Sequence, residues 1–149
     1  MRGLLQRVSS ASVVIEGKEY AAIEQGLVIL LGIKEGDDKK AADYLADKIV
    51  NLRIFEDNNG KVNLSAMDVG ADLLVISQFT LYADCRKGRR PSFIKAAKPG
   101  ISEPLYNYVV EKLKESGLRL TTGKFGADML VKISNNGPVT IMLDSEEKR

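Results

Sequence analysis

Hydroxyl and amide groups follow directly on one strongly apolar segment of the chain. The run of residues 72–77 predicts a buried strand. The residues at its end and just beyond are Ser77, Gln78, Phe79 and Thr80. Consecutive backbone N–H groups at a bend in this position can hold a developing oxyanion. The alternative, which these residue types favour, is a continued strand with Phe79 and Leu81 in the core and Thr80 facing outward.

Four cations lie within five residues in a segment that reads as a loop. They are Arg86, Lys87, Arg89 and Arg90. Gly88 between them lets the backbone approach a ligand closely. Clusters of this kind contact phosphates, and such contacts position a nucleic acid without reading its sequence. Because the whole chain carries a net charge of only +2, phosphate binding depends on this local cluster. A solvated loop is the alternative.

Two loops near the end of the sequence place glycine beside residues that could line a pocket. In residues 121–127, glycines surround Phe125, which indicates either an aromatic at a pocket wall or a plain loop with one core aromatic. Residues 135–140 read Asn-Asn-Gly-Pro-Val-Thr, and the residues alone favour an ordinary turn. A cis bond between Gly137 and Pro138 would instead direct two neighbouring carbonyls the same way, as an acceptor pair for an ammonium group.

Two features of the composition exclude whole classes of chemistry. The chain has no histidine, which removes Ser-His-Asp and Cys-His catalysis, imidazole bases and every histidine-ligated metal site. Its one cysteine, Cys85, cannot form an internal disulfide or a cysteine-rich zinc site. The acidic pairs at 37–38 and 146–147 are interpreted as a helix start and a solvated tail.

The elements that must position these residues follow from the hydrophobic pattern. Strands are predicted over residues 4–8, 12–15, 19–23, 26–32, 72–77, 118–122, 129–134 and 139–143, with a hairpin within 53–64. Helices are predicted over 37–52 and, with Ser102 as N-cap, over 102–116. The continuously apolar run 26–32 is expected to be a central strand buried on both faces. The pattern predicts an α+β fold with a curved or barrel-like sheet covered by two main helices.

Length and composition indicate one compact domain over residues 1–149. With 44% hydrophobic residues, a chain of 149 residues can bury a substantial core, and it is short for two typical domains. The opening residues lack the apolar stretch of a signal peptide. No apolar run approaches the roughly 20 residues needed to cross a bilayer. We therefore expect a cytoplasmic protein.

Five short motifs resemble those of the D-aminoacyl-tRNA deacylases, also called D-tyrosyl-tRNA deacylases. They occupy residues 1–8, 77–81, 86–93, 123–129 and 135–140. Each motif alone is weak, but five in order, over nearly the whole chain, are specific. One departure is Asn136, where the family often has aspartate, and it lies at a variable position.

The resemblance implies an enzyme without metal or cofactor. Its reaction would be hydrolysis of the ester joining a D-amino acid, or glycine mischarged on alanine tRNA, to the terminal adenosine. The enzyme would be a homodimer with its active site at the subunit interface. Residues 77–81 would supply the catalytic side, and Gly137-Pro138, in the cis form, would enter from the other subunit. Phe125 and Met129 would line the substrate pocket, and the basic cluster at 86–90 would contact tRNA phosphates.

Two mechanisms and two rival functions stay open. Thr80 could act as a nucleophile, although no histidine base can lie beside it. In the mechanism favoured here, the ribose 2′-hydroxyl of the tRNA assists attack by water, and the N–H groups around Phe79 and Thr80 stabilise the oxyanion. Ser77 and Gln78 then hold the adenosine end. The rival functions are a non-catalytic RNA-binding module and a small-molecule esterase that uses Thr80.

Overall fold

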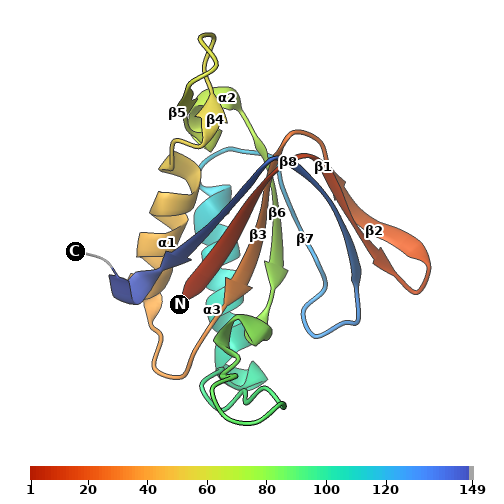
Figure 1. Ribbon diagram of the computed structural model, residues 1–149, viewed down its shortest axis with the longest axis vertical. Helices are drawn as coiled ribbons and strands as arrows, with labels where there is room; N and C mark the ends of the chain where they lie inside the picture. Colours follow the sequence, from red (N-terminus) through yellow and green to blue (C-terminus); the bar gives the residue numbers. More distant parts are fainter. Residues whose placement is uncertain (148–149) are drawn as a thin grey trace.

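Two long strands pair along almost their whole length at the centre of the fold. In the computed structural model, which describes residues 1–147, they are β1 (Arg2–Ile15) and β8 (Leu130–Asp144). They run antiparallel (Figure 1). The hydrophobic pattern predicts two short strands in each of these segments, and that prediction is wrong. Ser9 and Ser10 interrupt the apolar pattern of β1, but the strand absorbs them as an irregularity in its pairing with β8 and continues.

The other strands complete a six-stranded sheet that curls toward a barrel. β1 pairs antiparallel with β2 (Lys18–Ile23) and with β3 (Gly26–Gly32). Parallel pairings then lead from β3 to β6 (Asp72–Ser77) and on to β7 (Leu120–Thr122). β2 and β7, at the two ends of this path, come back into contact. β3 is buried along nearly its whole length, as predicted for a central strand.

Two helices pack against the sheet, as predicted. α1 (Lys39–Asn51) begins after Asp38, whose carboxylate accepts a hydrogen bond from the Ala41 amide at 2.9 Å. α3 (Pro99–Lys114) begins earlier than predicted, because Pro99 and not Ser102 opens the first turn. The fixed φ of proline suits that position. Apolar side chains of both helices and of the central strands form one main core.

Shorter elements connect the sheet and the helices. They are β4 (Phe55–Glu56), β5 (Val62–Leu64), α2 (Ala66–Val69), and the 3₁₀ helices η1 (Phe79–Tyr82) and η2 (Ser145–Glu147). β4 and β5 are the predicted hairpin. α2 is absent from the prediction, although Ser65 and Asp68 form a capping box at its start, a pattern that the sequence alone can signal.

Candidate active site

The segment after β6 turns away from the sheet instead of continuing as a strand. The Gln78 amide still donates to the Leu31 carbonyl at 2.8 Å, and η1 begins at the next residue. The turn packs closely on a glycine of β3, because a Cβ at Gly32 would lie 3.0 Å from Leu81 Cβ and 3.1 Å from the Gln78 oxygen. The Phe79 side chain is 54% exposed. The alternative that places Phe79 in the core of a continued strand is therefore wrong.

Two backbone donors at this turn have no hydrogen-bond acceptor among the residues that the structure describes. The amides of Phe79 and Thr80 open the 3₁₀ helix, so no carbonyl within it can reach them. No other residue within 1–147 accepts a hydrogen bond from them. The Thr80 hydroxyl accepts a hydrogen bond from the side-chain amide of Gln78. The turn thus presents adjacent free N–H groups, which is what an oxyanion site requires.

A cavity of about 560 Å³ lies beside this turn. The predicted site residues in its wall are Ser77, Gln78, Phe79, Phe125 and Met129. The fold therefore brings together two motifs that are far apart in the sequence. The ring of Phe125 packs against Tyr106 of α3, with ring centroids 5.7 Å apart. Thr80, also predicted for the site, is exposed and does not line the cavity.

The corner formed by Gly137 and Pro138 lies within β8 and is exposed. Its peptide bond is cis. The ordinary turn that the residues alone favour is therefore wrong, and the form implied by the family resemblance is confirmed. The Asn135 side chain spans the corner, accepting a hydrogen bond from the Val139 amide at 3.2 Å. Gly137 has a φ of +130°, which residues with a side chain rarely adopt.

A buried arginine that the sequence pattern does not single out holds this corner. Arg7 of β1 is only 7% exposed. Its guanidinium donates to the Asn136 carbonyl at 3.0 Å and to the Ile54 carbonyl at 2.9 Å. Glu56 provides a countercharge 4.0 Å away. Arg7 and Asn136 are 129 positions apart in the sequence. In the sequence, Arg7 is only a single cation within a predicted strand, which does not indicate this distant partner.

Within one chain, the corner and the cavity lie at opposite ends of β3. Ser77, in the cavity wall, pairs with Leu31 near the end of β3. Asn135, beside the corner, pairs with Val8, and Val8 pairs with Gly26 at the start of β3. The strand between Gly26 and Leu31 spans about 16 Å. The corner accordingly does not line the cavity of its own chain.

The predicted basic cluster divides into one paired cation and three unpaired ones. Asp84 and Ser92 close the loop that carries it, by exchanging backbone hydrogen bonds of 2.8 and 2.9 Å. Arg86 donates to both carboxylate oxygens of Asp84, at 2.8 and 2.6 Å. These hydrogen bonds hold the pKa of Asp84 well below its usual range. The other three cations are exposed, and none of them forms an ion pair with a described residue. They are Lys87, Arg89 and Arg90.

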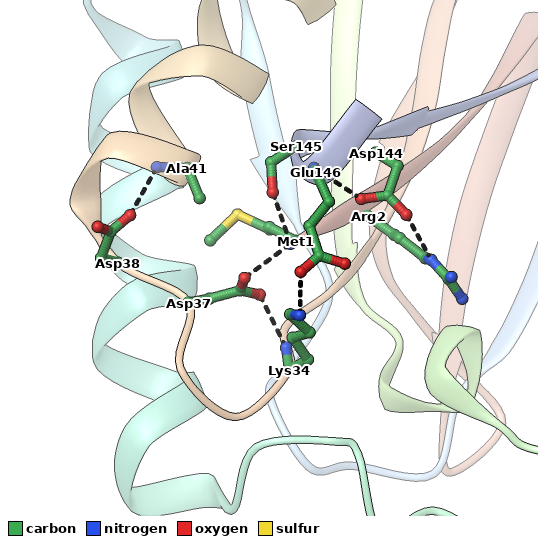
Figure 2. Close-up of polar contacts among 9 residues, drawn as sticks. All are labelled: Met1, Arg2, Lys34, Asp37, Asp38, Ala41, Asp144, Ser145 and Glu146. Atoms are coloured by element: carbon green, nitrogen blue, oxygen red, sulfur yellow. Dashed lines mark hydrogen bonds and ion pairs between the residues drawn. The ribbon is translucent and has the colours of Figure 1, made fainter. Parts of the chain in front are cut away.

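The start of the chain anchors the far end of η1. The Arg2 guanidinium donates to the Leu81 carbonyl at 2.9 Å and forms an ion pair with Asp144, also at 2.9 Å. Beside it, the buried Met1 ammonium contacts the Asp37 carboxylate at 2.8 Å (Figure 2). Arg2 thus ties η1, the helix that the free amides open, to β1 and β8.

In the part of the chain that the structure describes, no group of three or more cysteine, aspartate or glutamate side chains is placed to hold a metal ion. No helix there is both long and apolar enough to cross a membrane. Among the described residues that line the cavity, the one with a carboxylate side chain is Asp128.

Comparison with known proteins identifies the family. A model of the family described as D-Tyr-tRNA(Tyr) deacylase matches residues 4–144. The chain belongs to this family. Proteins named D-aminoacyl-tRNA deacylase from Syntrophomonas wolfei and Natranaerobius thermophilus are 54% and 57% identical to it, and each match covers 99% of both chains.

Two solved structures have the same fold as this member of the D-Tyr-tRNA(Tyr) deacylase family. A structure described as c-Myc DNA Unwinding Element Binding Protein is 42% identical, with a TM-score of 0.91 over 97% of this chain and 98% of that one. Another, described as a probable eukaryotic D-amino acid tRNA deacylase, has a TM-score of 0.83 over 95% of this chain and 97% of that one. Its identity is 16%, so that likeness concerns the fold alone. The family predicted from the five motifs is confirmed.

Proposed function

We propose that this chain hydrolyses the ester bond of D-aminoacyl-tRNA, adding water and releasing the free D-amino acid and the tRNA. Family membership and the names of close relatives support this activity. The observation that carries it is the pair of free amides at Phe79 and Thr80, beside a cavity of the size that small-molecule sites have. The reaction takes place in the cytoplasm. The side chains that hold the substrate are Ser77, Gln78, Phe125 and Met129.

Two copies of the chain form the working enzyme, with each active site at their interface. The Gly137-Pro138 corner is exposed, held by Arg7 and remote from its own cavity, so the corner of a second copy is available to complete the site. An exposed sheet face offers the apolar contact, since Met142 is 45% exposed and pairs with the half-buried Leu4. A two-fold axis then gives each chain's corner to the other chain's cavity.

The ribose 2′-hydroxyl of the substrate, and not Thr80, assists the attack of water. The Thr80 hydroxyl is exposed and bonded to Gln78, and the chain has no histidine to serve as its base. Water adds to the ester carbonyl, and the free amides stabilise the oxyanion that forms. The ester C–O bond then breaks, and the 3′-oxygen of the tRNA leaves with the proton that water gave up.

Thr80→Ala distinguishes this mechanism from nucleophilic attack by Thr80. We expect the variant to lose less than about tenfold in rate, the worth of one side-chain hydrogen bond, because the backbone amide and the substrate hydroxyl remain. The measurement is release of D-tyrosine from D-tyrosyl-tRNA in a single turnover. A loss of more than about a thousandfold, as for a missing nucleophile, would contradict the 2′-hydroxyl mechanism.

D and L esters carry the same chemical groups, so attractive contacts discriminate poorly between the two enantiomers. A rigid part of the pocket that clashes with one enantiomer discriminates better. Backbone carbonyls at the Gly137-Pro138 corner of the partner subunit accept hydrogen bonds from the substrate ammonium and leave no room for an L side chain. Glycine has no side chain and therefore meets no steric clash at this corner. The enzyme therefore also removes glycine mischarged on alanine tRNA, and both reactions proofread translation.

Matched D-tyrosyl-tRNA and L-tyrosyl-tRNA test the proposed function in one assay. We expect rapid release of D-tyrosine, and release of L-tyrosine at the rate of a sample without enzyme. A non-catalytic RNA-binding module, which the basic loop also suits, would release neither amino acid. An esterase for small molecules would cleave simple esters without any tRNA.

Replacing Arg89 and Arg90 together by alanine is expected to weaken tRNA binding and flatten its salt dependence. Each phosphate contact with a single strand adds about 0.7 to the slope of log K against log salt, so the slope falls by up to about 1.4. Arg86→Ala is the matched control, because this guanidinium is already paired with Asp84 and its loss changes the slope less. An unchanged slope in the double variant would rule out a phosphate role for the pair.

A further inference from the structure

An apolar pair projects into solvent from a segment whose backbone is firmly held. Ile94 is 90% exposed, and Phe93, just before it, is 39% exposed. Backbone hydrogen bonds of 3.0 Å tie this segment to residues 33–35 at two points. Neighbouring exposed apolar side chains mark interaction surfaces. A surface that is fixed in place yet uncovered is suited to receive a partner.

The apolar pair continues outward from the cavity wall. The rings of Phe93 and Phe79 meet edge to face, with centroids 5.0 Å apart, and both line the cavity. Ile94 follows in a tight turn, which a hydrogen bond from the Ala96 amide to the Phe93 carbonyl closes at 3.0 Å. The exposed pair therefore forms a rim beside the place where the proposed function puts the terminal adenosine.

The same stretch is strongly basic. From residue 87 to residue 98 the sequence has five cations and no acidic residue. They are Lys87, Arg89, Arg90, Lys95 and Lys98. All five are exposed, and none forms an ion pair within residues 1–147. A partner that is both apolar and negatively charged fits this surface. Single-stranded nucleic acid has that character, because its bases stack on aromatic side chains such as that of Phe93 while its phosphates meet the cations.

We propose that Phe93 and Ile94, with Lys95 and Lys98 beside them, bind the nucleotide that precedes the terminal adenosine at the single-stranded 3′ end of tRNA. This inference rests on the proposed function, which places the terminal adenosine in the cavity. A cavity of about 560 Å³ suits one aminoacyl-nucleoside, so the rest of the strand leaves across the rim. The base packs on the apolar pair, and the phosphates lie toward the lysines.

The same surface on a second copy of the chain is the competing occupant, and the charge argues against that contact. Two copies that met through this surface about a two-fold axis would bring two sets of five unpaired cations together. Like charges across an interface are costly. The sheet face around Leu4 and Met142 is the better candidate for contact between copies, because cross-strand partners there are apolar.

Ile94→Ser tests the inference, because it removes the apolar contact and changes no charge. Hydrolysis of D-tyrosyl-tRNA is compared with hydrolysis of the D-tyrosyl ester of adenosine, which lacks the preceding nucleotide. We expect kcat/KM for the tRNA ester to fall about tenfold relative to that for the adenosine ester, the effect of losing the burial of one large aliphatic side chain. Val62→Ser, which changes a 57% exposed valine in the β4–β5 hairpin, is the matched control and should not alter this ratio.

Equal losses on both esters, or no loss on either, would overturn the inference. A change of oligomeric state in Ile94→Ser, measured by sedimentation, would also overturn it, since it would assign the side chain to a contact between copies. Wild-type protein that cleaves neither ester would overturn the deacylase proposal itself. Failure of the deacylase proposal is distinguishable from failure of this inference, because it is observed with the wild-type protein alone.

Discussion

Gly137→Ala is expected to lower the rate of D-tyrosyl-tRNA hydrolysis by about a hundredfold. The residue has a φ of +130°, and an added Cβ would lie 2.9 Å from the Val139 side chain and 3.0 Å from the Arg7 guanidinium. Arg7 is buried and bonded to two carbonyls, so it cannot easily give way. The corner must shift instead, and a misplacement of about 1 Å in a group that positions substrate costs on the order of a hundredfold.

The control for this substitution is Gly100→Ala, because a Cβ at that position meets no atom within 4 Å. Single-turnover rates on D-tyrosyl-tRNA are measured for both variants, and thermal unfolding verifies that each is folded. The control should keep its wild-type rate. A wild-type rate in Gly137→Ala would mean that the corner does not line the active site.

Phe79→Pro should reduce kcat by about 10²–10³-fold, the usual effect of losing one oxyanion donor. Proline has no N–H, so the variant removes one of the two free amides at the turn. Proline also suits the first position of a helix, where its fixed φ agrees with the helical backbone. The fold of η1 is therefore expected to survive the substitution.

Phe79→Ala separates the role of the amide from the role of the ring. It keeps the N–H but removes the ring that meets Phe93 at 5.0 Å, so we expect mainly a higher KM with a smaller loss in kcat. Single-turnover and steady-state rates on D-tyrosyl-tRNA give both constants. If Phe79→Pro were no slower than Phe79→Ala, the amide would have no part in catalysis.

Elements with a strong local pattern could be predicted from the sequence. β3 and β6 have their predicted bounds because continuous apolar runs of strand length signal burial on both faces. α1 lies within its predicted range because its apolar residues recur at helical spacing and Asp38 caps its start. The family resemblance also names five residues that line one cavity, together with Thr80, which does not line it. The five are Ser77, Gln78, Phe79, Phe125 and Met129.

Features that depend on distant partners could not be predicted. The turn at η1 packs closely on Gly32 of another strand, whereas the local residue types favour a continued strand. Arg2 reaches the Leu81 carbonyl across 79 positions, and Arg7 reaches the Asn136 carbonyl across 129. The separation of corner and cavity follows from the strand register, and a one-dimensional pattern does not specify which strands pair.

Mixing two impaired variants tests most directly whether each active site combines residues 77–81 of one chain with the Gly137-Pro138 corner of another. Gly137→Ala keeps an intact 77–81 segment, and Phe79→Pro keeps an intact corner. After denaturation and refolding of an equal mixture, half of the pairs are mixed and each mixed pair has one intact site, so activity should return to about a quarter of wild type. Activity no higher than that of the separate variants would contradict a shared site.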